Sequence, residues 1–363
     1  MHEGGSVVTV LFFPDYSDAN PYQSNLAREI ATLDESVEMG AQFGLFPILR
    51  SYRSHDDVSA IHFHWLGPYI VAEGKPTTIV RVLMTLFELL LIKASGTAVV
   101  WTCHDVRTHE SRYPRIEYVS KRFLIRSGLC DRVFVHGEAV ADDLIETYDL
   151  PDLVRKRIVA IEHGHYIDNY ENGSTETTAR AELGIDTPGT VFLFFGQVRA
   201  YKGVFKLVEA FSAAAGPDSR LLVVGNPRNE QIENDLREAI RSDDRIGAHL
   251  EYVPDDRVHL YMNAANAVVL PFERITTSGS AILAMSFGKA LVVPRLGFAP
   301  DLLDEEGAVM YDPDEPNALT NAISTAESRD LPAMGEHNYR LAQGYDWRTV
   351  AERTVATYRD AGS

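Results

Sequence analysis

A turn between a strand and a helix in the second half of the chain holds the residues best suited to bind a charged ligand. The run VFLFF (191–195) is β-branched and aromatic, which is typical of a buried parallel strand. It stops at Gly196, and apolar residues at helical spacing begin after Gly203. Arg199 and Lys202 lie between, where parallel sheets bind their ligands. A guanidinium fork, an ammonium and a helix amino end suit a diphosphate, although a solvated turn with two unrelated cations would have the same spacing.

The string FFGQVRAYKG (194–203) resembles the G-x-x-R-x-x-K-G loop of GT-B glycosyltransferases, specifically the large retaining family numbered four. In that family the loop holds the diphosphate of a nucleotide sugar, so the resemblance implies that Gly196, Arg199 and Lys202 do so here. It extends in the expected order over most of residues 190–360 and is weaker in the first half. The further matching segments are LLVVGNP (221–227), VHLYMNAANAVVLPF (258–272), TSGSAILAMSFGKALVVP (277–294) and DWRTVAERTVATY (346–358).

A second candidate anion site is the turn formed by Thr277, Ser278, Gly279 and Ser280. It offers hydroxyl groups and backbone N–H groups at the start of a predicted helix, and the alternative is ordinary N-capping. The resemblance places this turn opposite the arginine and lysine loop. Fixed cations and helix ends can neutralise the charge that develops on a leaving diphosphate, so we expect no metal ion and no other cofactor.

The chain departs from the family at the paired glutamates. The resemblance places them at Ile275 and Leu283, and Glu273 is followed eight positions later by Ala281. The second glutamate usually binds the ribose, so ribose recognition must differ here, while Glu273 is a candidate to replace the first. A Thr-Ser-Gly turn at this place resembles a subgroup that builds lipid-linked or exported glycans.

In the first half, WTCHDVRTHE (101–110) holds the sharpest candidate site. His104 and Asp105 follow a predicted buried strand and resemble the family's t-x-H-D/N motif, whose histidine contacts the donor sugar. This resemblance implies that His104 and Asp105 are catalytic. His109 and Glu110 are candidate contacts to donor or acceptor hydroxyls, and Asn20 lies in a loop after the first strand that could face either substrate.

For the other histidines, the Asp-Pro-Asp motif and the cysteines, the sequence indicates structural roles. Five histidines, at 62, 64, 136, 163 and 165, fall at predicted strand ends and turns and show no zinc-ligand spacing. The motif Asp312-Pro313-Asp314 matches the D-x-D of metal-dependent transferases but is a short pattern in a proline turn. Two cysteines without metal or redox spacing suit a reducing cytosol.

The formal net charge of −18 argues against nucleic-acid binding. Residues 107–132 run against this trend, with seven basic and three acidic residues. The segment IEYVSKRFLIRSG (116–128) inside them predicts an amphipathic helix, which suits either an anionic membrane surface or an ordinary solvated face. The apolar stretch 79–96 is interrupted by three charged residues, so it predicts a mostly buried helix, with membrane contact as the alternative. No signal peptide opens the chain, so we expect a cytoplasmic protein, at most peripheral to the inner face of the membrane.

Strands alternate with helices throughout, which predicts an α/β fold. With the resemblance, we expect two Rossmann-like doubly wound domains facing across a cleft, the GT-B arrangement. The predicted divisions are an acceptor-side domain (1–170), a nucleotide-sugar-binding domain (171–345) and a terminal helix that packs back on the first domain (346–363). The polar stretch 171–184 is the predicted linker.

These observations predict a hexosyltransferase that moves a sugar from a nucleoside diphosphate sugar to a hydroxyl of a glycan or lipid-linked glycan. Retention of the anomeric configuration is implied by the resemblance alone. Two alternatives stay open. One is a non-catalytic glycan- or nucleotide-sugar-binding protein, which the missing glutamates favour. The other is a nucleotide-sugar epimerase, which would need a set of carboxylates that we do not find.

Overall fold

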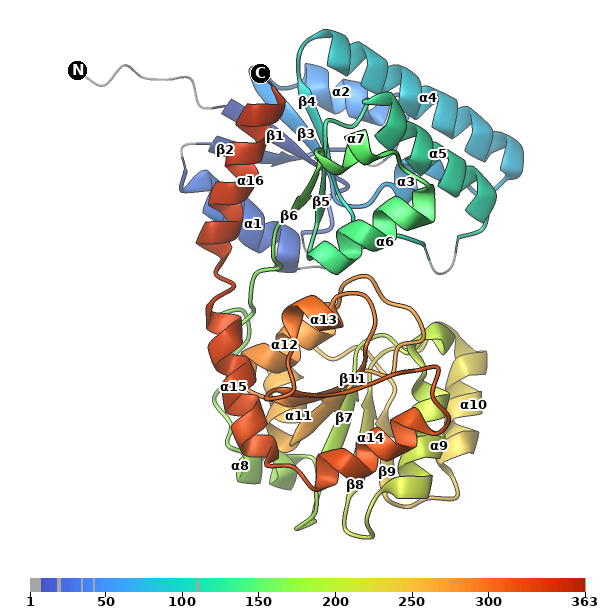
Figure 1. Cartoon of the computed structure of the whole chain (residues 1–363), viewed down its shortest axis with the longest axis vertical. Helices are drawn as coiled ribbons and strands as arrows, with labels where there is room; N and C mark the ends of the chain where they lie inside the picture. The colour runs from blue at the N-terminus through green and yellow to red at the C-terminus, as the bar shows by residue number, and fades with distance from the viewer. Residues whose placement is uncertain (1–7, 18–20, 34, 42, 109–110, 363) are drawn as a thin grey trace, which may run out of the picture. The chain divides into compact units, whose positions relative to one another are not determined.

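A computed structural model describes residues 8–17, 21–33, 35–41, 43–108 and 111–362. The chain divides into two compact units (Figure 1). One runs to His163 and takes in the residues from Asp346 onward, and the other spans Gly164–Tyr345. The division falls a few residues before the predicted one at 170/171, and the C-terminal helix is part of the first unit.

The first unit is a parallel six-stranded sheet of order β2-β1-β3-β4-β5-β6, covered by helices. The strand order reverses direction between β1 and β3, so ligands are expected at the carboxyl ends of this sheet. Its elements are β1 (Val8–Phe13), α1 (Pro21–Ala31), β2 (Glu35–Met39), α2 (Pro47–Arg53), β3 (Val58–Phe63), α3 (Gly67–Ile70), α4 (Lys75–Ala94), β4 (Ala98–Thr102), α5 (Pro114–Ser127), β5 (Arg132–Val135), α6 (Glu138–Tyr148), α7 (Asp152–Arg155), β6 (Ile158–Ala160) and the terminal α16 (Trp347–Ala361).

The C-terminal helix α16 is fixed to the first unit by polar as well as apolar contacts. Tyr358 and Trp347 of α16 are buried. The Tyr358 hydroxyl lies 2.6 Å from Nδ1 of His62 on β3, and Arg353 bonds to the carbonyl of Ala160 at the end of β6. These contacts hold α16 across the strands whose carboxyl ends carry the candidate histidines.

The second unit is also a parallel six-stranded sheet, of order β12-β11-β10-β7-β8-β9. The order reverses between β7 and β10, the strands that precede the two candidate phosphate loops. Its elements are α8 (Glu176–Glu182), β7 (Val191–Phe195), η1 (Ala200–Lys202), α9 (Val204–Ala214), β8 (Arg220–Val224), α10 (Glu230–Ile240), β9 (Ile246–His249), η2 (Asp255–Arg257), α11 (Val258–Ala264), β10 (Ala267–Val269), α12 (Gly279–Ser286), β11 (Ala290–Pro294), α13 (Ala299–Leu302), β12 (Ala308–Tyr311), α14 (Ala318–Glu327) and α15 (Leu331–Gln343).

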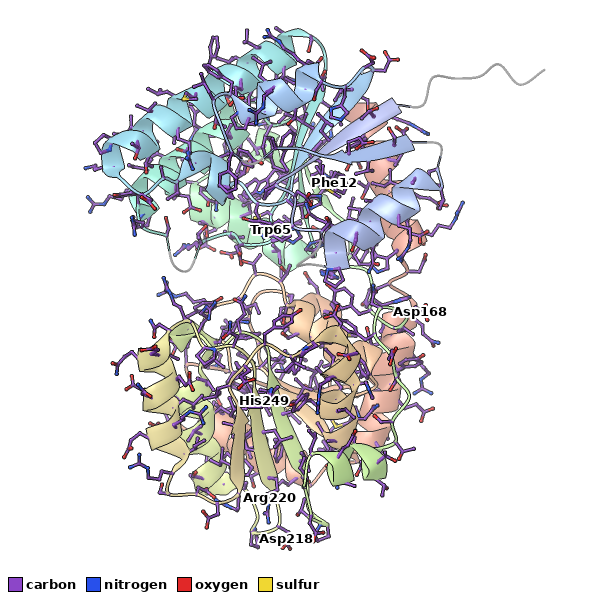
Figure 2. The ribbon with its side chains drawn as sticks, turned by 180° about the vertical axis from the view of Figure 1, so that it is seen from behind. Phe12, Trp65, Asp168, Asp218, Arg220 and His249 are labelled. Atoms are coloured by element: carbon purple, nitrogen blue, oxygen red, sulfur yellow. The ribbon has the colours of Figure 1, made fainter. Side chains whose placement is uncertain are left out.

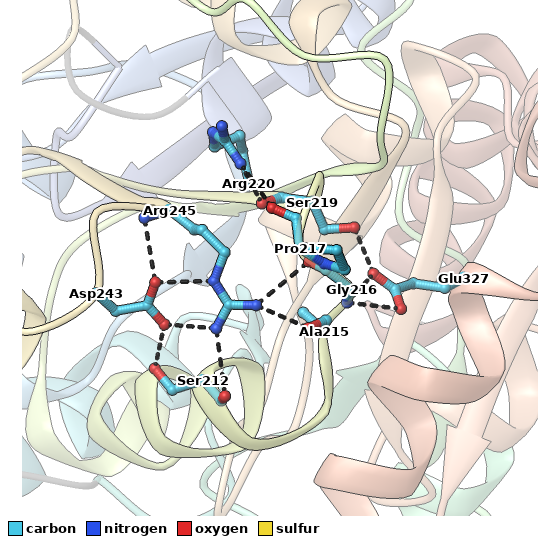
Figure 3. A network of polar contacts seen from close by, with 9 residues as sticks. All are labelled: Ser212, Ala215, Gly216, Pro217, Ser219, Arg220, Asp243, Arg245 and Glu327. Carbon is cyan, nitrogen blue, oxygen red and sulfur yellow. Dashed lines mark hydrogen bonds and ion pairs between the residues drawn. The ribbon is translucent and has the colours of Figure 1, made fainter.

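A polar network secures the end of this second sheet away from the candidate loops (Figure 3). Arg245, just before β9, makes a two-pronged contact with Asp243 and donates to the carbonyl of Ala215 at 2.7 Å. The Asp243 carboxylate also accepts from the Ser212 hydroxyl of α9. Because fork-shaped charged hydrogen bonds have strict geometry, the network fixes α9 relative to β9.

Two parts of the sequence prediction differ from the structure. The predicted linker 171–184 contains helix α8, which begins where the Thr175 side chain accepts from the Thr178 N–H. Arg180 of α8 donates to Asn266 and to the carbonyl of Ala264, so this polar segment packs against its own unit. The strand β2 was not predicted because its two glutamates hide the apolar alternation.

No helix in the described ranges is both long and apolar enough to cross a bilayer.

Candidate functional site

The loops after β7 and β10 bring the predicted phosphate-binding residues of the second unit together. Gly196 has a positive φ of 131°, a conformation that L side chains rarely adopt. A Cβ built on Gly196 would lie 3.1 Å from the Ser280 Oγ and 3.6 Å from the Lys202 Nζ. An ammonium and a hydroxyl from two different loops therefore flank a glycine backbone at the point where the strand order reverses.

Lys202 is held in this position by an aromatic ring. Its Nζ lies 5.5 Å from the centroid of the Phe272 ring, which follows β10. Gly203, the N-cap of α9, has a left-handed φ of 71°, and a Cβ there would also collide with the carbonyl of Pro271. The close approach of these two loops explains why the sequence has glycine at 203.

Arg199 lies on the side of the turn that faces β8. Its Nη1 donates to the carbonyl of Val198 at 3.2 Å and to that of Asn226 at 3.4 Å. Val198 also forms a bridge to Pro227, which ties the loops after β7 and β8. The guanidinium is thereby restrained beside these two loops, and it is only partly exposed.

The Thr277–Ser280 turn combines capping and ligand-facing groups. Ser278 is the N-cap of α12, and its Oγ accepts from the Ala281 N–H at 3.1 Å. The capping alternative therefore holds for this one hydroxyl. Ser280 instead directs its hydroxyl toward Gly196, and Gly279 at the first helical position is exposed. The first N–H groups of an α-helix have no partner within the helix, which makes this end suited to an anion.

The side chain of Glu273, the candidate replacement for the first family glutamate, forms an ion pair with a lysine. Its carboxylate pairs with Lys206 of α9 at 2.7 Å, and its N–H donates to the carbonyl of Tyr201. Both side chains of the ion pair are substantially exposed. Glu273 thus lies beside the phosphate loop, in contact with the first turn of α9.

In the first unit, His104 lies in a cluster of aromatic rings that the sequence analysis did not assemble. The carboxyl ends of four neighbouring strands, β3 to β6, each carry a histidine, and their rings contact one another. The centroids of His104 and His136 are 5.3 Å apart, as are those of His136 and His163, and His64 lies 5.8 Å from His104.

Two further aromatic residues complete the cluster. Tyr22, at the start of α1, packs edge-on against His104 at 4.8 Å and against His163 at 4.9 Å. Trp65 stacks on His104 with centroids 4.7 Å apart and planes 18° apart, and Figure 2 labels Trp65 just beyond the end of β3. The His104 ring is thus held between a stacked and an edge-on neighbour.

Burial lowers the pKa of three histidines of this cluster, His64, His104 and His136, and so keeps them neutral. It lowers the pKa of His136 to about 4. Burial, reinforced by the neighbouring His136, His64 and His163, holds the pKa of His104 well below its usual 6.5. Since the Nε2 of His136 and the Nδ1 of His104 are 3.4 Å apart, a proton on one ring would disfavour a proton on the other.

The sequence analysis did not predict the histidine cluster, because it explained each histidine separately by its position at a strand end or in a turn. A signal was present in the sequence: HFHW, TCHD, FVHG and IEHG each place a histidine directly after a predicted strand. Since carboxyl ends of parallel strands share one sheet edge, the four histidines had to meet there. His62, which lies on β3 two residues before His64, is structural as predicted, because its ring bonds to Thr102 and Tyr358.

The remaining predicted site residues are Asp105, Asn20, His109 and Glu110. Asp105 lies beside His104 and is partly buried. Asn20, His109 and Glu110 lie outside the described residues. Within the described ranges, no group of three His, Cys, Asp or Glu residues is arranged to hold a metal ion.

The basic segment 107–132 is less uniformly exposed than its charge suggested. Lys121 is buried and pairs with the buried Glu117 at 2.7 Å. Arg122 pairs with Asp149 and Arg132 pairs with Asp360. Arg115 and Arg126 on α5 are exposed.

Comparison with known proteins identifies relatives for both units. Residues 189–328 match the family model described as Glycosyl transferases group 1. The chain is 26% identical over 351 residues to the GDP-mannose:glycolipid 4-beta-D-mannosyltransferase of Xanthomonas campestris, covering 92% of this chain and 91% of that protein.

Solved structures share the fold over nearly the whole chain. The Anabaena protein HepE in complex with UDP-glucose superposes with a TM-score of 0.72 at 17% identity, covering 97% of this chain and 99% of HepE. Sucrose-phosphate synthase from Thermosynechococcus elongatus gives 0.75 at 17% identity, with 98% of each chain covered.

Proposed function

We propose that this chain, a glycosyltransferase with the GT-B fold, transfers a hexose from a nucleoside diphosphate sugar to a hydroxyl group of a lipid-linked glycan. One observation carries the donor half of the proposal. The Nζ of Lys202 and the Oγ of Ser280 flank Gly196 where the strand order of the second sheet reverses. Ligands of doubly wound folds bind at that point, and the charge matches a diphosphate.

The proposed transfer needs no metal ion. Negative charge develops on the diphosphate as the bond to the anomeric carbon breaks. Lys202, Arg199 and the amino end of α12 supply fixed positive groups, and preorganised groups of this kind can stabilise such charge without a cation. Lys202 needs little reorganisation because the Phe272 ring already positions it.

In the first unit, we assign His104 to the donor sugar. The family resemblance supports this role, and the lowered pKa means that the imidazole is neutral at pH 7. A neutral imidazole can accept or donate one hydrogen bond to a sugar hydroxyl. Asp105 is proposed to orient it, and Trp65 stacked on the ring limits its movement.

The acceptor half rests on the relatives. The Xanthomonas protein is named for a glycolipid acceptor, and it aligns over nearly the whole of this chain. We therefore propose a lipid-linked acceptor at the inner face of the membrane, with peripheral contact through the basic segment 107–132. Arg115 and Arg126 are the exposed residues of that segment best placed for anionic headgroups.

The test combines binding with turnover. Thermal stabilisation is measured with GDP, UDP, GDP-mannose and UDP-glucose in the presence of EDTA, because a ligand that binds only the folded protein raises its melting temperature. The stabilising donor is then incubated with lipid extracts, and transfer is followed by mass spectrometry. We expect stabilisation by one nucleotide, its loss in the Arg199→Ala/Lys202→Ala variant, and an acceptor heavier by one hexose.

Other outcomes would favour the alternatives. Donor binding without turnover on any lipid-linked or soluble glycan would indicate a non-catalytic nucleotide-sugar-binding protein. A new nucleotide sugar formed without acceptor would indicate an epimerase. A requirement for a divalent cation, restored after EDTA by Mg²⁺ or Mn²⁺, would contradict the metal-free mechanism.

A further inference from the structure

Helix α4 exposes an apolar stripe along its solvent face. Residues at helical spacing, 79/80, 83, 87 and 90/91, point outward over four turns, and all are apolar. Leu83 is 61% exposed and Phe87 is 50% exposed. A soluble helix normally places charged and polar residues on this face, so the stripe requires a reason.

Helix α5 continues the same surface. The residues just before α5 are tied to the start of α4, because Arg112 and Tyr113 both donate to the carbonyl of Glu73. At the other ends, Lys93 of α4 reaches Asp131 at 2.5 Å. The two helices therefore run side by side, as Figure 1 shows, and α5 adds two more exposed apolar residues, Val119 and Phe123.

The loop before α2 extends the surface further. Phe43 and Leu45 are 71% and 70% exposed, more than any apolar side chain of α4, and the centroid of the Phe46 ring lies 6.1 Å from that of Phe87. Of the twelve large apolar residues that are exposed in the described ranges, ten lie on α4, α5 or this loop. The exposed apolar residues are therefore gathered on one surface, which we call the α4–α5 face.

The exposed charged residues of α4 and α5 themselves are all basic, and two of them pair with acidic residues outside these helices, Lys93 with Asp131 and Arg122 with Asp149. The acidic residues of the two helices, Glu88 and Glu117, are both buried. The six basic residues other than buried Lys121 are at least partly exposed, namely Lys75, Arg81, Lys93, Arg115, Arg122 and Arg126. In a chain of net charge −18, this arrangement is complementary to an anionic surface.

A pocket opens on this face between α4, α3 and the loop before α2. Its volume is about 320 Å³, and Phe43, Pro47, Val80 and Met84 line it. The polar residues at its wall are already engaged by the protein. Glu88 accepts from the Leu49 N–H, Arg81 donates to the carbonyls of Pro68 and Val71, and Thr85 donates to that of Tyr69. An apolar guest therefore fits this lining better than a polar one.

We propose that the α4–α5 face docks onto an anionic lipid bilayer and that the pocket takes an alkyl chain of a bilayer lipid. Apolar side chains enter the acyl boundary while the flanking lysines and arginines meet the headgroups. The proposal deepens the membrane contact assigned above to segment 107–132 and moves its centre to α4. It rests on the proposed membrane contact but not on glycosyl transfer.

Vesicle co-sedimentation tests the docking. The full chain is mixed with vesicles of equal parts phosphatidylglycerol and phosphatidylcholine, or of phosphatidylcholine alone. The Leu83→Ser/Phe87→Ser variant removes two exposed residues of the stripe, and Leu153→Ser is the matched control because Leu153 is 76% exposed on α7. We expect partition to fall about tenfold or more in the double variant and to stay unchanged in the control. Arg115→Glu/Arg126→Glu should weaken binding to the anionic vesicles only.

Fluorescence of cis-parinaric acid, a chain-shaped probe, tests the pocket. Val80→Trp narrows the pocket and should abolish the fluorescence increase, whereas Leu153→Trp should not. Equal vesicle binding by the α4 variant and its control would overturn the docking proposal. So would a wild-type dimer in vesicle-free sedimentation that becomes monomeric only in the α4 variant, because the face would then bind a second copy.

Nucleotide stabilisation, measured on the same preparations, separates this inference from the proposed function. Vesicle binding that depends on Leu83 and Phe87 without any nucleotide binding would leave the docking proposal standing and contradict the transferase mechanism. Nucleotide binding and transfer to a soluble glycan, without vesicle binding, would support the transferase mechanism and contradict the docking proposal.

Discussion

The Nζ of Lys202 lies 5.5 Å from the centroid of the Phe272 ring, so the loop after β7 is connected to the loop after β10 by a cation–π contact. The negative face of the ring attracts the ammonium group and so orients it toward the loop after β10.

Removing this ammonium should weaken donor binding. We expect Lys202→Met to raise the dissociation constant of the stabilising nucleotide by about tenfold to hundredfold, the range for a lost charged hydrogen bond. Lys206→Met is the matched control, since Lys206 lies on the next helix and pairs with Glu273. Calorimetric titration measures the dissociation constant of the nucleotide for both variants. An equal loss of affinity in the two would mean that the nucleotide responds to the net positive charge of this region and not to the position of Lys202.

A methyl group at Gly196 should disturb the same site by shape. Its Cβ would approach the Ser280 hydroxyl at 3.1 Å, and φ is 131°. Gly184→Ala is the control, because Gly184 also has a positive φ, of 67°, but has open space around its Cβ position. We expect both variants to lose about 1–2 kcal/mol of stability and only Gly196→Ala to lose nucleotide affinity. Urea unfolding and titration together measure this, and unchanged affinity in Gly196→Ala would place the phosphates elsewhere.

The loops of the second unit could be predicted because local spacing determines them. Strand, glycine turn and helix follow each other within a few residues, so Arg199 and Lys202 had to lie at a sheet edge. The histidine cluster depends on strand order, which brings His104 and His136 together across 32 positions of sequence. The prediction of a mostly buried helix over 79–96 is wrong for the outer face of α4, since an apolar helix that faces solvent has the same composition as one that faces a core.

The histidine cluster predicts a loss of stability in mild acid. The folded pKa of His136 is lowered to about 4 from 6.5, so the unfolded chain binds protons first as the pH falls. The contribution of the buried histidines to stability should be constant above about pH 7.5 and decrease from about pH 6.5 toward pH 4. The difference of about 2.5 units corresponds to about 3 kcal/mol for His136 at 1.36 kcal/mol per unit.

Urea unfolding at several pH values measures this profile. His136→Asn should reduce its slope by about one proton. A flat profile between pH 6.5 and 5 would contradict the assignment of neutral, buried histidines.

The network of Figure 3 predicts a purely structural defect. Arg245→Met removes the fork to Asp243 and should cost about 2–3 kcal/mol of unfolding free energy at pH 7. The arginine holds the pKa of Asp243 below its usual range, so this stabilisation is present above about pH 4 and is lost as the pH falls further. Arg241→Met is the control, because its pair with Glu238 is largely exposed. Unfolding at pH 7 and at pH 3 tests the prediction, and a deficit that persists undiminished at pH 3 would contradict it.

The anomeric configuration of the product tests how far the family resemblance reaches. Inversion requires a general base with a pKa near the working pH, whereas burial leaves His104 a poor proton acceptor. The family resemblance implies that the donor's α configuration is retained, and the low basicity of His104 agrees with this expectation. The Xanthomonas relative is named for a β-linked mannose, so the linkage must be measured on this enzyme's own product. The anomeric proton in the NMR spectrum of the first-formed glycan reports it directly. A β product would show that retention does not extend to this chain, and a carboxylate such as Asp105 would then have to be tested as the base by the pH dependence of kcat in Asp105→Asn.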